Sequence, residues 1–338
     1  MNKRRVVIYK SEGKLEAVVR TALKEVGILD GLNSSTRVAI KPNLTYPHYK
    51  PGVTTSPAVI RAAVKVLSDY SPHITIVETD GGYGVWSANE AFEGHGLFGI
   101  AKEFGIKVVN LCDGEKEYIS FKAGLWQRGL PLPKLLLRET DLFITMPVPK
   151  IHAMTLVSLA YKNQWGCIPD IMRLRRHSIF NEAIVEINKV LKPAVLADGT
   201  YFLDQHGPME GVPIKMDYII AATDAGAFDR YVSEMMGIDW RHVPHLSRAA
   251  AQGEMPMGLE EIQYNISPAA AKTHTFRLHR GLRDWIAFVG FKSRFMTWFG
   301  YESWFGRVVL HSILYAIAGP NVKPKSYDPG TAKHPPAA

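Results

Sequence analysis

The stretch MPVPKIHAMTLVSLAYKNQWGCIPD at residues 146–170 decides the fold prediction, because it begins where a strand ends. The apolar run 142–146 is typical of a buried strand, and the prolines that follow it interrupt regular pairing. Lys150 and His152 come directly after those prolines. Ligands of open α/β sheets collect beyond the carboxyl ends of strands, so we expect a binding pocket here.

A second polar cluster closes the same stretch. The apolar segment 154–161 runs into Lys162 and Asn163, so polar groups bracket an apolar element at both ends. Each cluster also has a structural interpretation, because a lysine after a strand is usually solvated and a lone histidine usually packs in the core. The stretch therefore predicts a site only in combination with other motifs.

Strand and helix patterns alternate along the first 240 residues, which predicts an α/β fold. Strands are expected at 5–9, 37–40, 74–77, 107–111, 142–146, 194–196 and 218–222, and helices at 15–26, 58–67, 89–104 with a break at 94–96, and 181–191. This alternation indicates a mainly parallel or mixed sheet with helices on both faces. We expect an α/β core at 1–271, with one or two subdomains, a helical extension at 272–320 and a disordered tail at 321–338.

Other expected strands also end in polar residues or glycines. Lys41 and Asn43 follow the strand at 37–40, Gly81 and Gly82 follow the one at 74–77, and Asp198 follows the one at 194–196. Glycines at such positions let the backbone approach a ligand. These residues are predicted to bind substrate or cofactor.

Further candidates lie in loops. Thr54 and Thr55 precede Ser56, a good N-cap, so together they form an anion cradle or simply an ordinary capped helix. Arg175 lies in the basic run 173–177, which either binds a phosphate or carboxylate or is a solvated surface. Gly207 and Pro208 complete the predicted binding set.

The composition is that of a folded protein that favours anionic partners. The chain has 338 residues, 46% of them hydrophobic and 21% charged, and a formal net charge of +8. Such a charge attracts phosphate-bearing small molecules, nucleic acid or an acidic membrane surface. Cys112 and Cys167 are the only cysteines, so no iron–sulfur cluster is expected from this chain alone, and the cofactor is left unknown.

Hydropathy predicts a cytoplasmic protein, either free or peripheral to the membrane. The apolar run at 6–9 is too short for the core of a signal peptide. No stretch reaches the roughly 18 uninterrupted apolar residues that a spanning helix needs.

The segment 272–311 combines basic and aromatic residues at helical spacings. This pattern fits a helix at a membrane surface, a lid over an apolar pocket, a dimer contact, or helices packed on the core. Single-stranded nucleic acid would tolerate the same mixture, but no recognised motif supports it, so no nucleic acid partner is expected. The oligomeric state is left open.

Six separated stretches together resemble the domain-of-unknown-function family 362. They are VAIKPNL at 38–44, GVTTSP at 52–57, ETDGG at 78–82, PKIHAMTLVSLAYKNQWGCIPD at 149–170, ADGTYFLDQHGPMEG at 197–211 and ATDAGAFDRYVSEMMGID at 222–239. The resemblance spans about residues 38–240. It implies that the following positions converge on one site: Lys41, Asn43, Lys150, His152, Lys162, Asn163, His177 and Asp198.

The resemblance also implies a redox setting, since many relatives resemble this core fused to a ferredoxin-like module with cysteine-rich motifs. This chain lacks such a module. Redox chemistry here would therefore need a separate electron-transfer partner protein or a dissociable cofactor.

Three functional hypotheses follow. The first is an enzyme, with oxidoreductase as one class under consideration, that binds an anionic small molecule carrying phosphate or carboxylate, with Lys150, His152, Lys162 and His177 as the catalytic residues. The second makes His152, His177 and Asp198, together with Asp80, ligands of a catalytic metal. The third is a non-catalytic protein that binds a membrane through 272–311.

Overall fold

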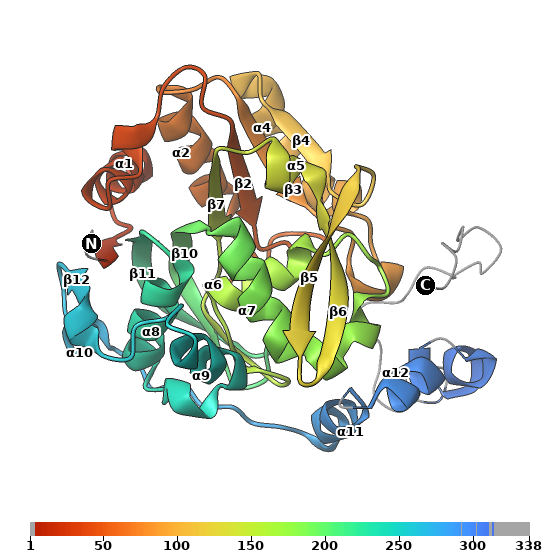
Figure 1. The fold of residues 1–338 in the computed structure, drawn as a ribbon. Coiled ribbons are helices and arrows are strands. Elements are labelled where there is room, and N and C mark those ends of the chain that lie inside the picture. Colours follow the sequence, from red (N-terminus) through yellow and green to blue (C-terminus); the bar gives the residue numbers. More distant parts are fainter. Residues whose placement is uncertain (1–3, 292, 302, 311–312, 314–338) are drawn as a thin grey trace.

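The computed structural model describes residues 4–291, 293–301, 303–310 and 313, and its centre is a ten-stranded mixed sheet (Figure 1). The strands of this sheet are β1 (Arg4–Lys10), β2 (Val38–Pro42), β3 (Ile74–Glu78), β4 (Lys107–Asn110), β7 (Leu142–Met146), β8 (Lys150–His152), β9 (Leu156–Ser158), β10 (Ala194–Asp204), β11 (Val212–Ala222) and β12 (Ile262–Tyr264). Their order is β12-β1-β11-β10-β7-β2-β3-β4, and β8 pairs with both β10 and β9.

Most pairs in this sheet are parallel. β10, β7, β2, β3 and β4 form a continuous parallel series, whereas β11 runs antiparallel to both of its neighbours, β10 and β1. In the register of the central pair, Lys41 of β2 lies opposite Thr145 of β7. The carboxyl ends of these two strands therefore meet at one edge of the sheet.

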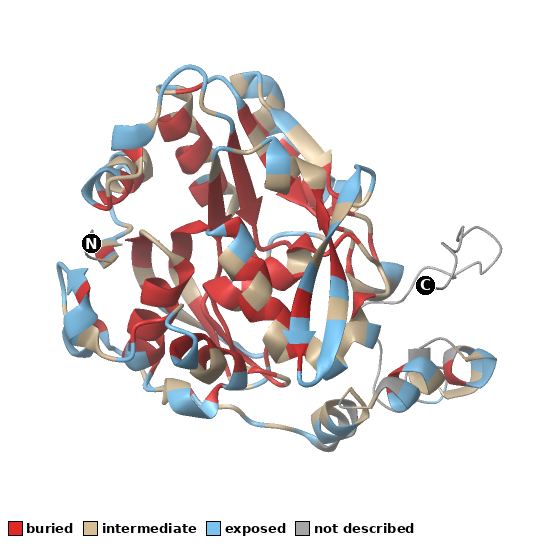
Figure 2. Cartoon of the chain, in the orientation of Figure 1, coloured by how far each residue is buried: buried red, intermediate tan, exposed pale blue. Residues whose placement is uncertain are grey.

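Helices cover both faces of the sheet, which confirms the predicted α/β fold (Figure 2). Side chains alternate between the two faces along β11: Ile219 and Ala221 join one apolar cluster, and Ile220 and Ala222 join the other. The first face carries α1 (Leu15–Glu25), α2 (Pro57–Ser68), α3 (Ala88–Gly94) and α4 (Leu97–Phe104), and the second carries α6 (Ala160–Asn163), α7 (Phe180–Leu191), α8 (Ala225–Met236) and α9 (Pro244–Ala251).

Local sequence signals explain several helix boundaries. The hydroxyl of Ser56 accepts a hydrogen bond from the Ala58 amide, as expected for an N-cap before Pro57. The predicted helix at 89–104 is divided at Gly96, which has a left-handed φ of 67° and separates α3 from α4. The expected interruption at the glycines is therefore confirmed.

A β-hairpin formed by β5 (Lys116–Ala123) and β6 (Trp126–Pro133) lies beside the main sheet and was not predicted. The second strand reads WQRGLPLP, and a glycine and two prolines argue against a strand when only the sequence is considered. A two-stranded ribbon tolerates them, because each strand is an edge and leaves half of its amides unpaired.

After the short helix α10 (Pro268–Ala271), the C-terminal region begins as an extended segment on the core and continues into the short helices α11 (Leu282–Gly290) and α12 (Arg294–Tyr301). Phe276 is buried against Phe202, and Leu278 bridges to Gln205. Among the described residues no helix has both the length and the apolar content to cross a bilayer. The tail predicted at 321–338 lies outside the described residues.

The chain leaves β2 and β7 in opposite directions across the sheet. From β2 it proceeds to β3 and β4, whereas from β7 it proceeds to β10 on the other side. Such a change of direction opens a crevice beyond the carboxyl ends of the two strands. The topology therefore assigns the binding cleft to the loops after Pro42 and Met146.

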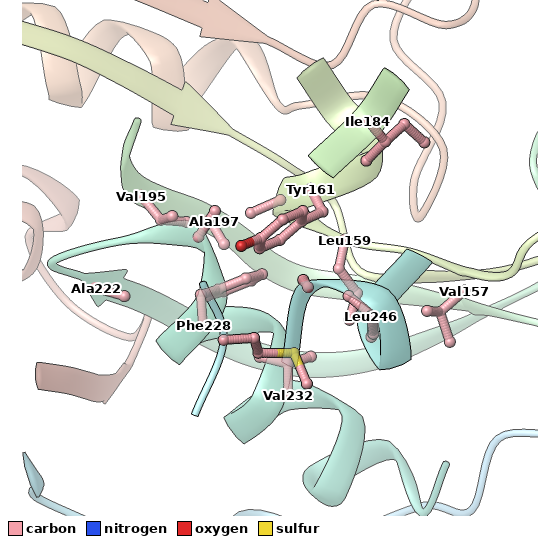
Figure 3. Close-up of a cluster of buried hydrophobic side chains, with 14 of the residues drawn as sticks. Val157, Leu159, Tyr161, Ile184, Val195, Ala197, Ala222, Phe228, Val232 and Leu246 are labelled. Atoms are coloured by element: carbon pink, nitrogen blue, oxygen red, sulfur yellow. The ribbon is translucent and has the colours of Figure 1, made fainter. Parts of the chain in front are cut away.

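One buried carboxylate holds the short helix that faces this crevice. Asp229 of α8 accepts hydrogen bonds from the amides of Ala160 and Tyr161 at 2.8 and 3.1 Å, which caps α6. Figure 3 shows the Tyr161 ring among apolar side chains that include Leu159 and Phe228. The next two residues, Lys162 and Asn163, are thereby fixed at the cleft.

We predict that Asp229→Ala lowers the free energy of unfolding by about 2–3 kcal/mol, because two buried amides lose their acceptor. Asp224→Ala, which removes the half-exposed cap of α8, is the control and is expected to cost about 1 kcal/mol. Urea unfolding monitored by circular dichroism measures both. Equal losses in the two variants would contradict the anchoring role of Asp229.

Candidate functional site

A cavity of about 340 Å³ lies at the carboxyl ends of β2, β3 and β7, where the topology places a cleft. It is lined by residues from four of the motif stretches found in the sequence. The predicted site residues among them are Lys41, Asn43, Gly81, Gly82, Lys150, His152, Lys162, Asn163, His177 and Pro208.

A buried ion pair forms one wall of the cavity. The Nζ of Lys41 lies 2.9 Å from Oε2 of Glu78, and both side chains are almost completely buried. Glu78 also accepts hydrogen bonds from the amides of Thr79 and Leu44. Gly166 packs on this pair so closely that a Cβ there would lie 2.9 Å from the lysine Nζ. The backbone at Gly166 and the side chains of the ion pair therefore restrict each other's position.

Lys150 is buried as deeply as Lys41. Its Nζ donates a short hydrogen bond to the Val53 carbonyl. Burial lowers its pKa well below the ordinary value for lysine, and the charges of Lys162 and Lys41 lower it further. The surroundings of Lys150 therefore disfavour the charged form of its amine.

Two histidines line the cavity in defined orientations. The Nδ1 of His152 accepts a hydrogen bond from the Met154 amide, so Nε2 carries the ring proton. The Nδ1 of His177 donates to the Leu174 carbonyl, which leaves Nε2 as an acceptor. Burial lowers the pKa of His177 to about 3 and that of His152 well below its ordinary value.

Lys162 extends into the cavity from α6. Burial lowers its pKa to about 7, and the nearby cations Arg173 and Lys41 contribute. Arg173 itself is buried and donates to the carbonyls of Asp80 and Asp170. Both acceptors are backbone carbonyls, and the carboxylates of Glu78, Asp170 and Asp80 interact with the guanidinium from nearby.

Hydrogen bonds join the polar groups of β2 and β7 to the cavity wall. The Asn163 amide donates to the Thr145 hydroxyl at 2.8 Å. The Thr55 hydroxyl accepts from the Asn43 amide and donates to the Met146 carbonyl. These bonds hold the two strand ends together.

Five predicted residues lie outside the cavity lining: Thr54, Thr55, Arg175, Asp198 and Gly207. Thr54 and Thr55 bond to backbone groups of the loop, and Asp198 accepts bonds from the amides of Ser56 and Thr200. Arg175 pairs with Asp170. Gly207 packs on the Ile151 carbonyl so closely that a Cβ would lie 1.7 Å away. In the structure they support the loops around the site.

Fourteen of the residues that line the cavity were absent from the predicted set, and they include Glu78, Trp165, Arg173 and Phe291. Glu78 and Trp165 lie inside the family motifs, and Arg173 lies in the basic run, so their positions beside predicted residues were an available signal. Phe291 lies more than 100 residues further along the chain than Trp165, and no local pattern relates the two.

The predicted metal ligands do not gather. Across the described residues, no group of three or more His, Cys, Asp or Glu side chains is arranged to hold a metal ion. His152 and His177 line the cavity, whereas Asp198 lies outside it. The polar lining of the cavity consists of lysine amines, the Arg173 guanidinium, two imidazoles, the Glu78 carboxylate, and amide and hydroxyl groups.

Comparisons with known proteins agree with the motifs. A family described as a domain of unknown function (DUF362) matches residues 38–234. A thylakoid-associated protein of Synechocystis sp. is 26% identical over 259 residues, which are 73% of this chain and 78% of that protein. A crystal structure of a protein from Thermotoga maritima is similar with a TM-score of 0.39 and 12% identity. That similarity covers 73% of this chain and 61% of the length of the Thermotoga protein.

We predict that Glu78→Gln lowers the free energy of unfolding by about 3–5 kcal/mol, because it leaves Lys41 buried without a counter-charge. The double variant Lys41→Met/Glu78→Leu should lose less than Glu78→Gln alone, since no unpaired charge remains. Urea unfolding measures all of them. Glu117→Gln, which breaks the exposed pair with Arg138, is the control and should change little. A double variant less stable than Glu78→Gln would contradict this account.

Proposed function

Since this chain belongs to the family described as a domain of unknown function (DUF362), a description that assigns no chemistry, we propose its function from the cavity itself. We propose that the protein is an enzyme that binds an anionic substrate or cofactor, bearing phosphate or carboxylate. The basic side chains that line the cavity around the bound anion are Lys41, Lys150 and Lys162, with the guanidinium of Arg173 beside them.

The observation that carries this proposal is the state of Lys162. Lys41 is paired with Glu78, and Lys150 donates to a carbonyl. Lys162 lines the cavity, and within the described part of the chain its Nζ has neither a hydrogen bond nor an ion pair; its close contact is the Phe180 ring, 5.3 Å away. An amine aimed into a cavity among other cations gains most from an anion.

The same amine is suited to moving a proton. A pKa of about 7 means that Lys162 is about equally charged and neutral at neutral pH, which is the condition for efficient general acid–base catalysis. A bound anion would favour the charged form. Proton transfer by Lys162, with charge stabilisation by Arg173, supports a group transfer, an isomerisation or a redox reaction.

A redox reaction would draw its electrons from outside the chain. Cys112 and Cys167 are the two cysteines of the sequence, too few to ligate a cluster. Burial raises the pKa of both thiols to about 12, so neither is an activated nucleophile. A dissociable cofactor or an electron-transfer protein would be the source.

A second candidate function, peripheral membrane association, is favoured by the C-terminal extension. Trp285, Phe295, Trp298 and Trp304 are between 49% and 68% exposed. Aromatic side chains of this kind are enriched at membrane–water interfaces, and the surrounding segment is basic. The thylakoid-associated name of the Synechocystis relative is in line with this candidate.

We predict that Lys162→Met weakens the binding of sulfate, used as a fully ionised probe, by tenfold or more, without lowering the melting temperature. Binding to the wild type should be strongest below pH 7, where the free amine is already charged. The affinity for sulfate should fall by up to about tenfold per pH unit above 7, because Lys162 must then take up a proton when the anion binds. Isothermal titration calorimetry from pH 6 to 9 measures both effects.

The control for this experiment is Lys102→Met, which removes an exposed lysine on α4 and should bind sulfate as the wild type does. Sulfate affinity that is the same in Lys162→Met and in the wild type would overturn the proposal. Sulfate affinity that rises between pH 6 and 8 would equally contradict the assigned role of the amine.

We predict that Trp304→Ser weakens binding to vesicles of phosphatidylglycerol and phosphatidylcholine about fivefold or more, because an interfacial tryptophan is lost. Trp126→Ser is the matched control. Trp126 is 67% exposed and Trp304 is 68% exposed, but Trp126 lies on the hairpin and not in the extension. Co-sedimentation at several salt concentrations provides the measurement. Equal losses in the two variants, or no vesicle binding by the wild type, would refute the localisation to the extension.

A further inference from the structure

One residue of the C-terminal extension forms part of the cavity wall. Phe291 follows α11 directly and lines the same cavity as Lys162. Its ring stacks on the imidazole of His177 with centroids 4.5 Å apart and an interplanar angle of 26°. The extension and the binding cavity are therefore in direct contact.

A continuous series of rings leads from the cation to this residue. The Nζ of Lys162 lies 5.3 Å from the centroid of Phe180. Phe180 stacks on His177 at 5.1 Å and 16°, and His177 in turn stacks on Phe291. His177 is held between two phenyl rings with its pKa lowered to about 3 by burial, so it presents an uncharged face. This series of side chains is therefore polar at its Lys162 end and apolar at its Phe291 end.

Other apolar side chains also line the cavity. They are Met154, Trp165, Leu174 and Met209. A small, fully hydrated anion such as phosphate would gain little from such a wall, whereas a hydrocarbon group would gain by leaving water. The cavity thus offers two kinds of surface to one ligand.

The apolar surface continues outside the cavity. On the two helices that flank Phe291, Val289 of α11 is 63% exposed and Phe295 of α12 is 65% exposed. Figure 1 shows both helices outside the layers of the core, at the lower right of the molecule. Phe291 lies between these two helices in the chain, so a ligand that follows its ring out of the cavity of about 340 Å³ is directed toward them.

We propose that the ligand of this site is an amphiphile: an anionic head group bound at Lys162 and Arg173, carrying a hydrocarbon chain that lies along His177 and Phe291 toward α11 and α12. This inference rests on the proposed anion site and specifies its ligand class. The cavity volume is at the small end for ligand pockets, which suits a head group and the first part of the chain.

The test is calorimetric titration of the full chain at pH 7 with ethyl, butyl and hexyl phosphate, each below its micellar concentration. The affinity should rise about fourfold for each methylene that the cavity buries. Phe291→Ala should remove most of this gain and leave ethyl phosphate binding nearly unchanged. Phe291→Leu should retain it, since leucine keeps an apolar surface in the same place.

Phe98→Ala, which removes a part-exposed ring on α4, is the control and should show the wild-type dependence on chain length. Equal affinities for ethyl and hexyl phosphate would overturn the amphiphile inference and leave the anion site intact. An undiminished gain in Phe291→Ala would also overturn it, because the hydrocarbon chain would then lie elsewhere. Failure of all three phosphates and of sulfate to bind would overturn the anion site as well.

Discussion

The parallel pairing of β2 with β7 is the constraint on which the site depends. It sets Lys41 opposite Thr145 and brings two strand ends together, and the chain then departs from them in opposite directions. Hydrogen bonds through Thr55 and Asn163 fasten the loops that follow. Every residue of the cavity is placed relative to this pair of strands. The register of these two strands therefore determines which side chains can meet at the site.

Electrostatics then divides the cations into different roles. Glu78 is close enough to neutralise Lys41, and the deep burial of Lys150 favours its neutral form. Lys162 is left between its charged and neutral forms, because burial and Arg173 oppose its charge while the cavity gives it room to meet an anion. Three lysines in one cavity thus have three distinct states. Their surroundings, and not their chemical identity, make the difference.

Much of the fold and part of the site could be read from the sequence. The strands at β2, β3 and β7 are short apolar runs that end in proline or acidic residues, and Ser56 before Pro57 marked the start of α2. Lys150, His152 and Lys162 were found because they bracket an apolar element.

What sequence could not supply were contacts between distant segments. Sequence alone could not show whether Asp198 binds a ligand or supports a loop. A carboxylate after a strand gives the same pattern whether it faces a cavity or accepts hydrogen bonds from the amides of Ser56 and Thr200. The hairpin β5–β6 was missed, because prolines in its second strand hide the alternation. Phe291 was missed because its partner His177 lies in another motif and only tertiary packing joins them.

The capping of α6 by Asp229 also sets an order of assembly. The carboxylate is separated by 69 residues from the amide of Ala160 that it binds. All the lysines of the cavity precede Asp229 in the chain, and so does every strand that carries them. A nascent chain that has not yet reached α8 has these strands and cations but no acceptor for the first turn of α6. The binding site can therefore be completed only after α8 has been synthesised.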